Sequence, residues 1–229
     1  MTPAPAKLAL EDGTVFTGRA FGAAAEVAGE VVFNTSLTGY QEVLTDPSYK
    51  GQIVTMTYPL IGNYGTTADD QESLAVQVSG FVVRELTRVP SNFRSHRDLD
   101  TYLKASGVPG IEGIDTRALV RRLRVRGAMV GVLSTTDLDD AALVRKAQAA
   151  PKMTGRDLVK EVVPDKPFGR DRGFDSLAAH VLPARPADKH VVALDYGMKW
   201  NILRCLTQVG CRVTVLPGTA TAADVLKHK

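Results

Sequence analysis

A cluster of hydroxyl, amide and carboxylate side chains lies between two short apolar runs within residues 30–65. Such groups can donate and accept hydrogen bonds to a polar substrate, and the interspersed glycines permit tight backbone paths around them. The same residue types also form turns in which they satisfy their own backbone. The sequence therefore predicts either a substrate-binding loop or a set of structural turns, formed by Asn34, Thr35, Ser36, Thr38, Asp46, Ser48, Tyr49 and Asn63.

Short strands are expected to position this cluster. Residues 31–33 and 53–58 are rich in β-branched and aromatic side chains, which favour strands on either side of the polar connection. Residues 8–21 predict a hairpin that turns at Asp12 and Gly13. Residues 74–86 also predict strand structure, with an interruption near Gly80.

Helical patterns follow in the middle of the chain. Residues 98–106 predict a short helix, a second helix begins after Asp115 and stops at Gly127, and a third spans residues 139–149. Residues 128–135 predict a strand. Because the strands are short and begin as hairpins, we expect a mixed α/β domain instead of a regular doubly wound sheet.

The last part of the chain has a different pattern. Residues 164–189 carry prolines, glycines and charges typical of a linker. An apolar strand over 190–195, a helix over 200–209 and a strand over 211–216 predict a βαβ unit, and another helix starts at residues 222–227. Two parallel strands and one crossover helix cannot cover both faces of a sheet, so we expect this second domain to be incomplete.

Composition indicates a soluble globular protein. The 229 residues are 44% hydrophobic and 23% charged, and the net charge of +3 is too small to indicate a nucleic-acid or membrane partner. The amino terminus lacks the pattern of a signal peptide, and no apolar run is long enough to span a membrane. With only two cysteines, a cytoplasmic location is expected.

Arginines recur at helical spacing as Arg117, Arg121 and Arg124, and Arg122 and Arg126 add to the charge. A cationic stripe of this kind can bind an acidic partner surface or nucleic acid. We expect instead a solvated helix face whose arginines pair with carboxylates, because no aromatic residues interleave with the stripe and the overall charge is mild. Gly107, Gly110 and Gly113 lack the lysine and hydroxyl residue of a phosphate loop, so we expect turn residues there.

Several uncommon motifs carry a family resemblance. FNTSLTGYQE, TDPSY and TYPLIGNYG, together with LEDGTVFTGRAFG, SNFR and GIDTRALVRRLRVRGAM, resemble the amino-terminal domain of the small, glutamine-hydrolysing subunit of carbamoyl-phosphate synthetase. VVALDYGMKWNILRCL resembles the opening of a class I glutamine amidotransferase domain. The resemblance implies a mixed-sheet β/β/α domain at residues 1–163, a linker at 164–189 and the truncated start of a flavodoxin-like parallel α/β domain at 190–229.

The resemblance also implies a function. Proteins of this family hydrolyse L-glutamine and pass ammonia to a large subunit, which uses ATP and magnesium to make carbamoyl phosphate for arginine and pyrimidine synthesis. No cofactor or metal is implied in this chain itself. The alternative is a non-catalytic docking module for the large subunit. Of the residues here, Ser48 of TDPSY corresponds to a serine that contacts glutamine, and Lys199, in the loop after the first strand of the second domain, is a weaker candidate for an anionic substrate group.

The family's catalytic triad of cysteine, histidine and glutamate is not expected in this chain. A cysteine nucleophile needs a sharp strand-to-helix turn that exposes its sulfur near backbone amides. Cys205 falls within a predicted helix and Cys211 begins a predicted strand, so both are expected to be small buried core residues. The four histidines, which are scattered and lack a glutamate two residues later, are His96, His180, His190 and His228.

Overall fold

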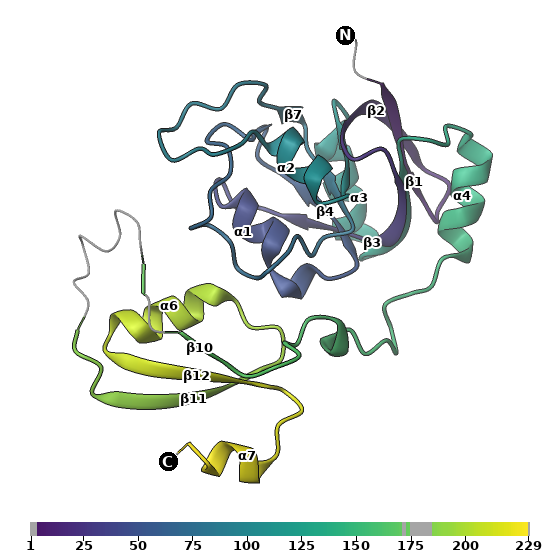
Figure 1. The fold of residues 1–229 in the computed structure, drawn as a ribbon. Coiled ribbons are helices and arrows are strands. Elements are labelled where there is room, and N and C mark those ends of the chain that lie inside the picture. Colours follow the sequence, from purple (N-terminus) through teal and green to yellow (C-terminus); the bar gives the residue numbers. More distant parts are fainter. Residues whose placement is uncertain (1–3, 171–172, 175–184, 229) are drawn as a thin grey trace. The chain divides into compact units, whose positions relative to one another are not determined.

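The computed structural model describes residues 4–170, 173–174 and 185–228 (Figure 1). The chain forms two compact units. The first comprises the residues up to Asp70 together with Leu74–Arg156, and the second comprises Gln71–Ser73 together with the residues from Asp157 onward. Each unit combines helices with parallel and antiparallel strands, so the predicted mixed α/β class is confirmed.

The first unit is built on a closed barrel of seven strands. Four pairings are antiparallel, those of β1 with β2, β2 with β8, β3 with β9, and β1 with β9; three are parallel, those of β3 with β4, β4 with β6, and β6 with β8. In spatial order the strands are β1 (Pro5–Leu10), β2 (Val15–Gly22), β8 (Pro109–Glu112), β6 (Gly80–Val82), β4 (Gln52–Met56), β3 (Glu26–Asn34) and β9 (Met129–Ser134).

The predicted hairpin is confirmed as the antiparallel pair of β1 and β2. The Asp12 carboxylate accepts a hydrogen bond from the Thr14 amide at 3.0 Å, and Gly13 has a φ of 90°, which a side chain would disfavour. Further along β2, a Cβ at Gly18 would lie 2.3 Å from the Glu112 carbonyl oxygen of β8. Glycine at this position therefore allows the two strands to pair closely.

Three helices of the first unit begin where an aspartate can cap them. They are α2 (Leu99–Ala105), α3 (Thr116–Arg126) and α4 (Asp140–Ala149). Asp98, Asp115 and Asp139 accept hydrogen bonds from the third amide of these helices at 2.8, 2.9 and 2.6 Å. The predicted helix starts are confirmed, because a carboxylate that satisfies a free terminal amide is a strong local signal.

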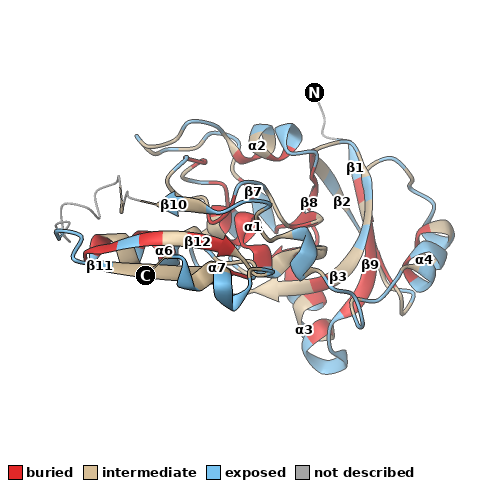
Figure 2. Ribbon diagram, turned by 60° about the horizontal axis from the view of Figure 1, so that its bottom comes forward, coloured by how far each residue is buried: buried red, intermediate tan, exposed pale blue. Residues whose placement is uncertain are grey.

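Apolar side chains fill the barrel and the space beneath the helices. Figure 2 shows buried residues in red along barrel strands such as β8 and β9. All of β9 is buried, and α4 lies outside β1 and β9, where Leu143 and Ala147 pack on Ala9 and Val132. Each fully buried leucine or isoleucine stabilises the fold by about 1.5–3 kcal/mol. The largest fully buried aliphatic side chains of this unit are Leu8, Leu10, Leu44, Ile53, Met56, Ile61, Leu99, Leu103, Ile111 and Leu119.

The structure corrects three expectations for the first unit. The polar connection after residue 34 contains a short helix, α1 (Tyr40–Thr45), which was not predicted. Gly80 begins β6 instead of interrupting a strand, and a short strand β7 (Glu85–Leu86) follows and pairs with β5 (Leu60–Ile61). Gly110 lies within β8 against the Phe21 ring, so its prediction as a turn residue was wrong, whereas Gly107 and Gly113 do adopt positive φ.

The second unit contains a three-stranded sheet. β11 (Lys189–Asp195) and β12 (Cys211–Pro217) are parallel and are joined by α6 (Trp200–Gln208), which confirms the predicted βαβ unit. β10 (Phe168–Arg170), which lies in the stretch predicted as a linker, adds to β12 in antiparallel orientation. A 3₁₀ turn (Val159–Glu161) precedes β10, and α7 (Ala222–Leu226) follows β12.

Three residues from early in the sequence belong to this second unit. Glu72 is buried and accepts hydrogen bonds from the first two amides of α6: its carbonyl from the Trp200 amide at 2.9 Å and its carboxylate from the Asn201 amide at 2.8 Å. The buried Arg204 guanidinium donates to the Gln71 carbonyl at 2.8 Å. A distant segment thus caps α6, because free amides at a helix start favour a carboxylate.

Candidate functional site

Ser48 is exposed on a 3₁₀ turn, η1 (Pro47–Tyr49), between α1 and β4. The Asp46 carboxylate accepts a hydrogen bond from the Ser48 amide at 2.9 Å, and the Asp46 carbonyl accepts one from the Tyr49 amide at 3.0 Å. These bonds fix the backbone of the turn. The Ser48 hydroxyl bonds to no other residue in the described part of the chain, so it is available to a ligand.

The end of β3 also supports this turn. Asn34, the last residue of β3, donates from its side-chain amide to the Tyr49 hydroxyl at 2.9 Å. Its carbonyl accepts the Thr57 amide at 3.0 Å, just after the parallel neighbour β4. The turn is therefore tied to two barrel strands, which hold Ser48 more precisely than a free loop could.

α1 is fixed by a second loop, residues 64–67. The Tyr64 hydroxyl accepts hydrogen bonds from the Gly39 amide at 2.6 Å and the Tyr40 amide at 3.2 Å, in place of a side-chain cap on the helix itself. The Tyr40 hydroxyl donates to the Gly65 carbonyl at 2.6 Å. Gln41 exchanges two hydrogen bonds with the Thr67 backbone, at 2.6 and 2.8 Å.

The two tyrosines are structural groups and not acids or bases of a reaction. Burial is the main cause that raises the pKa of Tyr64 to about 12, with the charge of Glu42 adding to it. Burial also raises the pKa of Tyr40 far above its ordinary value. Both phenols stay protonated at neutral pH and act as hydrogen-bond partners.

Lys199 lies in the second unit, at the residue before α6. It is exposed, as expected for a loop between a strand and a helix. The backbone before it is fixed by Asp195, at the end of β11, whose carboxylate accepts the Gly197 and Met198 amides at 2.8 and 2.7 Å. Ser48 and Lys199 thus occupy exposed positions in separate units, and their contacts with glutamine stay predictions.

The cysteines differ from one another. Cys211 is buried in β12 beside Leu203 and Val213, as predicted. Cys205 is exposed on α6, so its predicted burial was wrong. No hydrogen bond joins either thiol to a histidine within the described residues.

The histidines show no catalytic or metal-binding grouping where they are described. His190 shares a hydrogen bond of 2.9 Å with the Thr214 hydroxyl, and its ring meets that of His228 edge-on. His180 lies outside the described residues. Among residues 4–170, 173–174 and 185–228, no three histidine, cysteine, aspartate or glutamate side chains gather as a metal would require.

The α3 arginines divide into two sets. Arg122 and Arg126 bond to the Asp12 carboxylate at 2.6 and 3.2 Å, as expected for a face with paired carboxylates. Arg117, Arg121 and Arg124 are exposed and have no carboxylate partner in the described part of the chain, so the pairing expected of them was wrong.

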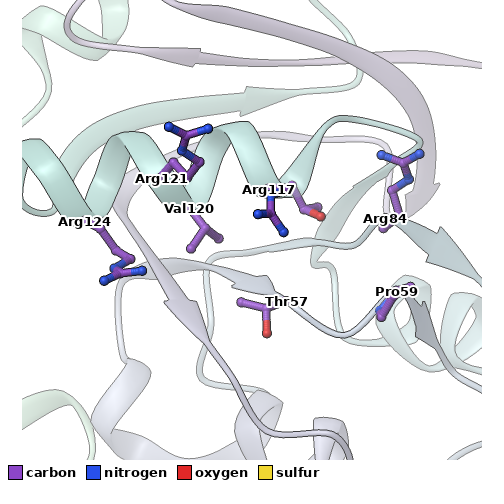
Figure 3. A pocket seen from close by; sticks show the side chains of 8 residues that line it. Thr57, Pro59, Arg84, Arg117, Val120, Arg121 and Arg124 are labelled. Carbon is purple, nitrogen blue, oxygen red and sulfur yellow. The ribbon is translucent and has the colours of Figure 1, made fainter.

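The unpaired arginines line a hollow of about 580 Å³, which we call the arginine groove (Figure 3). Arg117, Val120 and Arg124 point from α3 toward the side where Thr57 lies. Arg84, Thr57 and Pro59 were not predicted, because only the folding of the barrel brings them beside α3. The lining is Thr57, Pro59, Arg84, Thr116, Arg117, Val120, Arg121 and Arg124.

Comparison with known proteins identifies the family. Residues 8–133 match the family model described as "Carbamoyl-phosphate synthase small chain, CPSase domain". Proteins called carbamoyl phosphate synthase small chain are 55% identical in Rhodopirellula baltica, 56% in Syntrophotalea carbinolica and 50% in Escherichia coli K12, over 97%, 96% and 97% of this chain.

The alignments cover 59%, 58% and 59% of these relatives, so the chain spans less than two thirds of their length. The family match nevertheless includes more than half of the chain, and it contains both the Ser48 turn and the arginine groove. The chain belongs to the carbamoyl-phosphate synthase small-chain family.

Proposed function

We propose that this chain acts as part of a glutamine-dependent carbamoyl-phosphate synthase, in which a small chain hydrolyses L-glutamine and delivers ammonia to a large chain. The large chain would use ATP and magnesium to form carbamoyl phosphate for arginine and pyrimidine synthesis. The family match over residues 8–133 supports this assignment above the alternative of a non-catalytic docking module for the large chain. The small number of cysteines fits action in the cytoplasm.

In this proposal, Ser48 contacts glutamine. The observation that carries it is the exposed hydroxyl of Ser48 on a turn fixed by Asp46 and Tyr49. A hydroxyl can donate to a carboxylate and accept from an ammonium group, so it suits the α-carbon end of glutamine. Because the backbone of the turn is fixed before substrate arrives, little backbone ordering entropy is lost on binding.

Lys199 and the second unit have a supporting role in the proposal. A flavodoxin-like amidotransferase domain is built from repeated βαβ units such as β11–α6–β12. Lys199 follows the carboxyl end of β11, just before α6. A cation at this edge would favour an anionic substrate group. The catalytic cysteine, histidine and glutamate are not assigned to residues of this chain.

The proposed contact is tested by steady-state kinetics of Ser48→Ala in the complete small chain together with its large chain. The glutamine KM should rise about tenfold or more with little change in kcat, because a hydrogen bond to a charged group contributes about 1.5–3 kcal/mol to ground and transition states alike. Synthesis from free ammonia should be unchanged. Ser91→Ala, at an exposed serine outside this connection, is the matched control.

An unchanged glutamine KM for Ser48→Ala would remove Ser48 from the site. Failure of the wild-type chains to make carbamoyl phosphate from either nitrogen source would reject the proposed function itself.

A further inference from the structure

The arginine groove concentrates positive charge that the described part of the fold does not neutralise. Arg117, Arg121 and Arg124 come from one helix, and Arg84 joins them from the connection between β6 and β7. On the same helix, Arg122 and Arg126 already bond to Asp12. Like charges held side by side repel one another, so an anionic occupant would stabilise the groove.

The spacing of these arginines favours an extended occupant. Arg117 and Arg124 are two turns apart on α3, which separates them by about 10 Å along the helix axis. Two arginine side chains can also converge on one phosphate, but three or four residues of extended polypeptide, at about 3.3 Å each, span the same distance and can place a separate carboxylate at each arginine. Arg84 lies beyond Arg117 and lengthens the row (Figure 3).

The lining between the charges is apolar. Val120 lies between Arg117 and Arg124 on α3, and Pro59 lies on the other wall. No aromatic side chain is among the lining residues, so the groove lacks the stacking surfaces that single-stranded nucleic acid uses. An occupant that places an apolar side chain between acidic ones would satisfy both parts of the lining.

We infer that the arginine groove binds an extended acidic segment of the large chain, with carboxylates on Arg117 and Arg124 and an apolar side chain against Val120. This inference rests on the proposed function, because it takes the large chain as the partner. Guanidinium groups hold carboxylates in paired hydrogen bonds, which gives the contact a defined register as well as charge attraction.

The test compares binding of the purified large chain to the 229-residue chain and its variants. The doubly substituted Arg117→Glu/Arg124→Glu chain should bind at least about tenfold more weakly, and its Kd should depend less on salt. Arg117→Gln/Arg124→Gln should give a smaller loss. Arg145→Glu, an exposed arginine of α4 outside the groove, carries the same type of charge change and should bind within about twofold of wild type.

The outcomes separate the inference from the proposed function. If the wild-type chain binds and Arg117→Glu/Arg124→Glu binds equally well, the groove is not the docking site although the proposed function stands. If the wild-type chain does not bind the large chain, the proposed partnership and the inference both fail. Binding of tripolyphosphate, a small polyanion, to the wild-type chain and to Arg117→Glu/Arg124→Glu provides a second measurement. If the double variant loses tripolyphosphate binding but still binds the large chain, the groove binds a small polyanion and the inference is overturned.

Discussion

The rings of Tyr40 and Tyr64 stack with their centroids 4.2 Å apart and their planes inclined by 22°. The Tyr64 hydroxyl at the same time accepts hydrogen bonds from the amides that open α1. One aromatic side chain therefore serves as both packing partner and helix cap for the segment that leads into the Ser48 turn.

Replacing Tyr64 with phenylalanine keeps the stacked ring but removes this cap. We expect a loss of about 1–2 kcal/mol in the free energy of unfolding at neutral pH, since two amides lose their acceptor. Urea unfolding of the variant and of Tyr58→Phe, at an exposed tyrosine, measures the difference. Equal stability of all three proteins would show that water replaces the cap without cost.

The same variant should change the alkaline limit of stability. Burial raises the pKa of Tyr64 from 10.0 to about 12, so the folded state keeps a proton that the unfolded chain releases. This contribution is complete below pH 10 and is lost as pH rises toward 12. Wild-type stability should fall over that interval, and less steeply in Tyr64→Phe; parallel pH curves would contradict the assignment.

Asp12 links the first hairpin to α3. Burial alone would raise its pKa, but hydrogen bonds from Thr14 and Arg122 outweigh burial and bring the pKa below the ordinary 3.8. The charged form therefore stabilises the fold at neutral pH, and this contribution is lost as pH falls below 3.8 through the folded-state pKa. Asp12→Asn should cost about 1–2 kcal/mol at neutral pH.

The acid dependence distinguishes this charge effect from simple packing. Thermal unfolding of wild type and Asp12→Asn should converge as pH is lowered from neutrality below 4. A stability difference that is constant over this range would mean that the carboxylate charge contributes nothing.

Glu112 is 1% exposed and accepts a hydrogen bond from the Leu86 amide at 3.0 Å. It also pairs with Arg19 at 3.3 Å and with Arg88. The two arginines are half exposed, so water can solvate them if the carboxylate is lost, whereas the buried Leu86 amide would stay unpaired.

We therefore expect the acceptor to matter more than the charge. Glu112→Ala should destabilise the fold by about 2–3 kcal/mol, Glu112→Gln by about 1 kcal/mol because its carbonyl still accepts, and Arg88→Ala by less than about 1 kcal/mol. Urea unfolding ranks the three variants. A larger loss for Arg88→Ala than for Glu112→Ala would reverse the interpretation.

The cysteines should behave as non-catalytic residues. Incubation of the 229-residue chain with glutamine, with and without the large chain, should release no ammonia above background, because neither thiol hydrogen-bonds to a histidine among the residues that the structure describes. A thiol reagent should modify Cys205 in the folded protein and Cys211 only on unfolding. Ammonia release abolished by Cys205→Ser or Cys211→Ser would overturn this prediction.

Local signals made much of the fold predictable. Asp98, Asp115 and Asp139 predicted the helix starts, and Asp12 with Gly13 predicted the hairpin. Helix caps and tight turns depend only on residues close by in the sequence, so they can be predicted locally. The βαβ unit followed from one apolar helix between two apolar strands. For the candidate site, Ser48 came from the family resemblance, which the residue pattern alone could not replace.

Features that depend on distant residues were not predictable. α1 is short and takes its cap from Tyr64, so its own sequence carries a weak helical signal. Three features arise from contacts between residues far apart in the sequence. They are the closure of the barrel, the capping of α6 by Glu72 and the position of Arg84 beside α3. Cys205 shows the same limit, since a general tendency of cysteine to be buried did not fix which side of α6 faces solvent.

Closure of the seven-stranded barrel has a consequence for recognition. Every one of its strands is paired on both sides, so the barrel offers no open backbone edge along which another chain could add a strand. A protein that binds this barrel must therefore contact its side chains, and side chains, unlike the backbone, can be changed by substitution. Specificity can consequently be altered one arginine at a time while the hydrogen-bonded framework stays as it is.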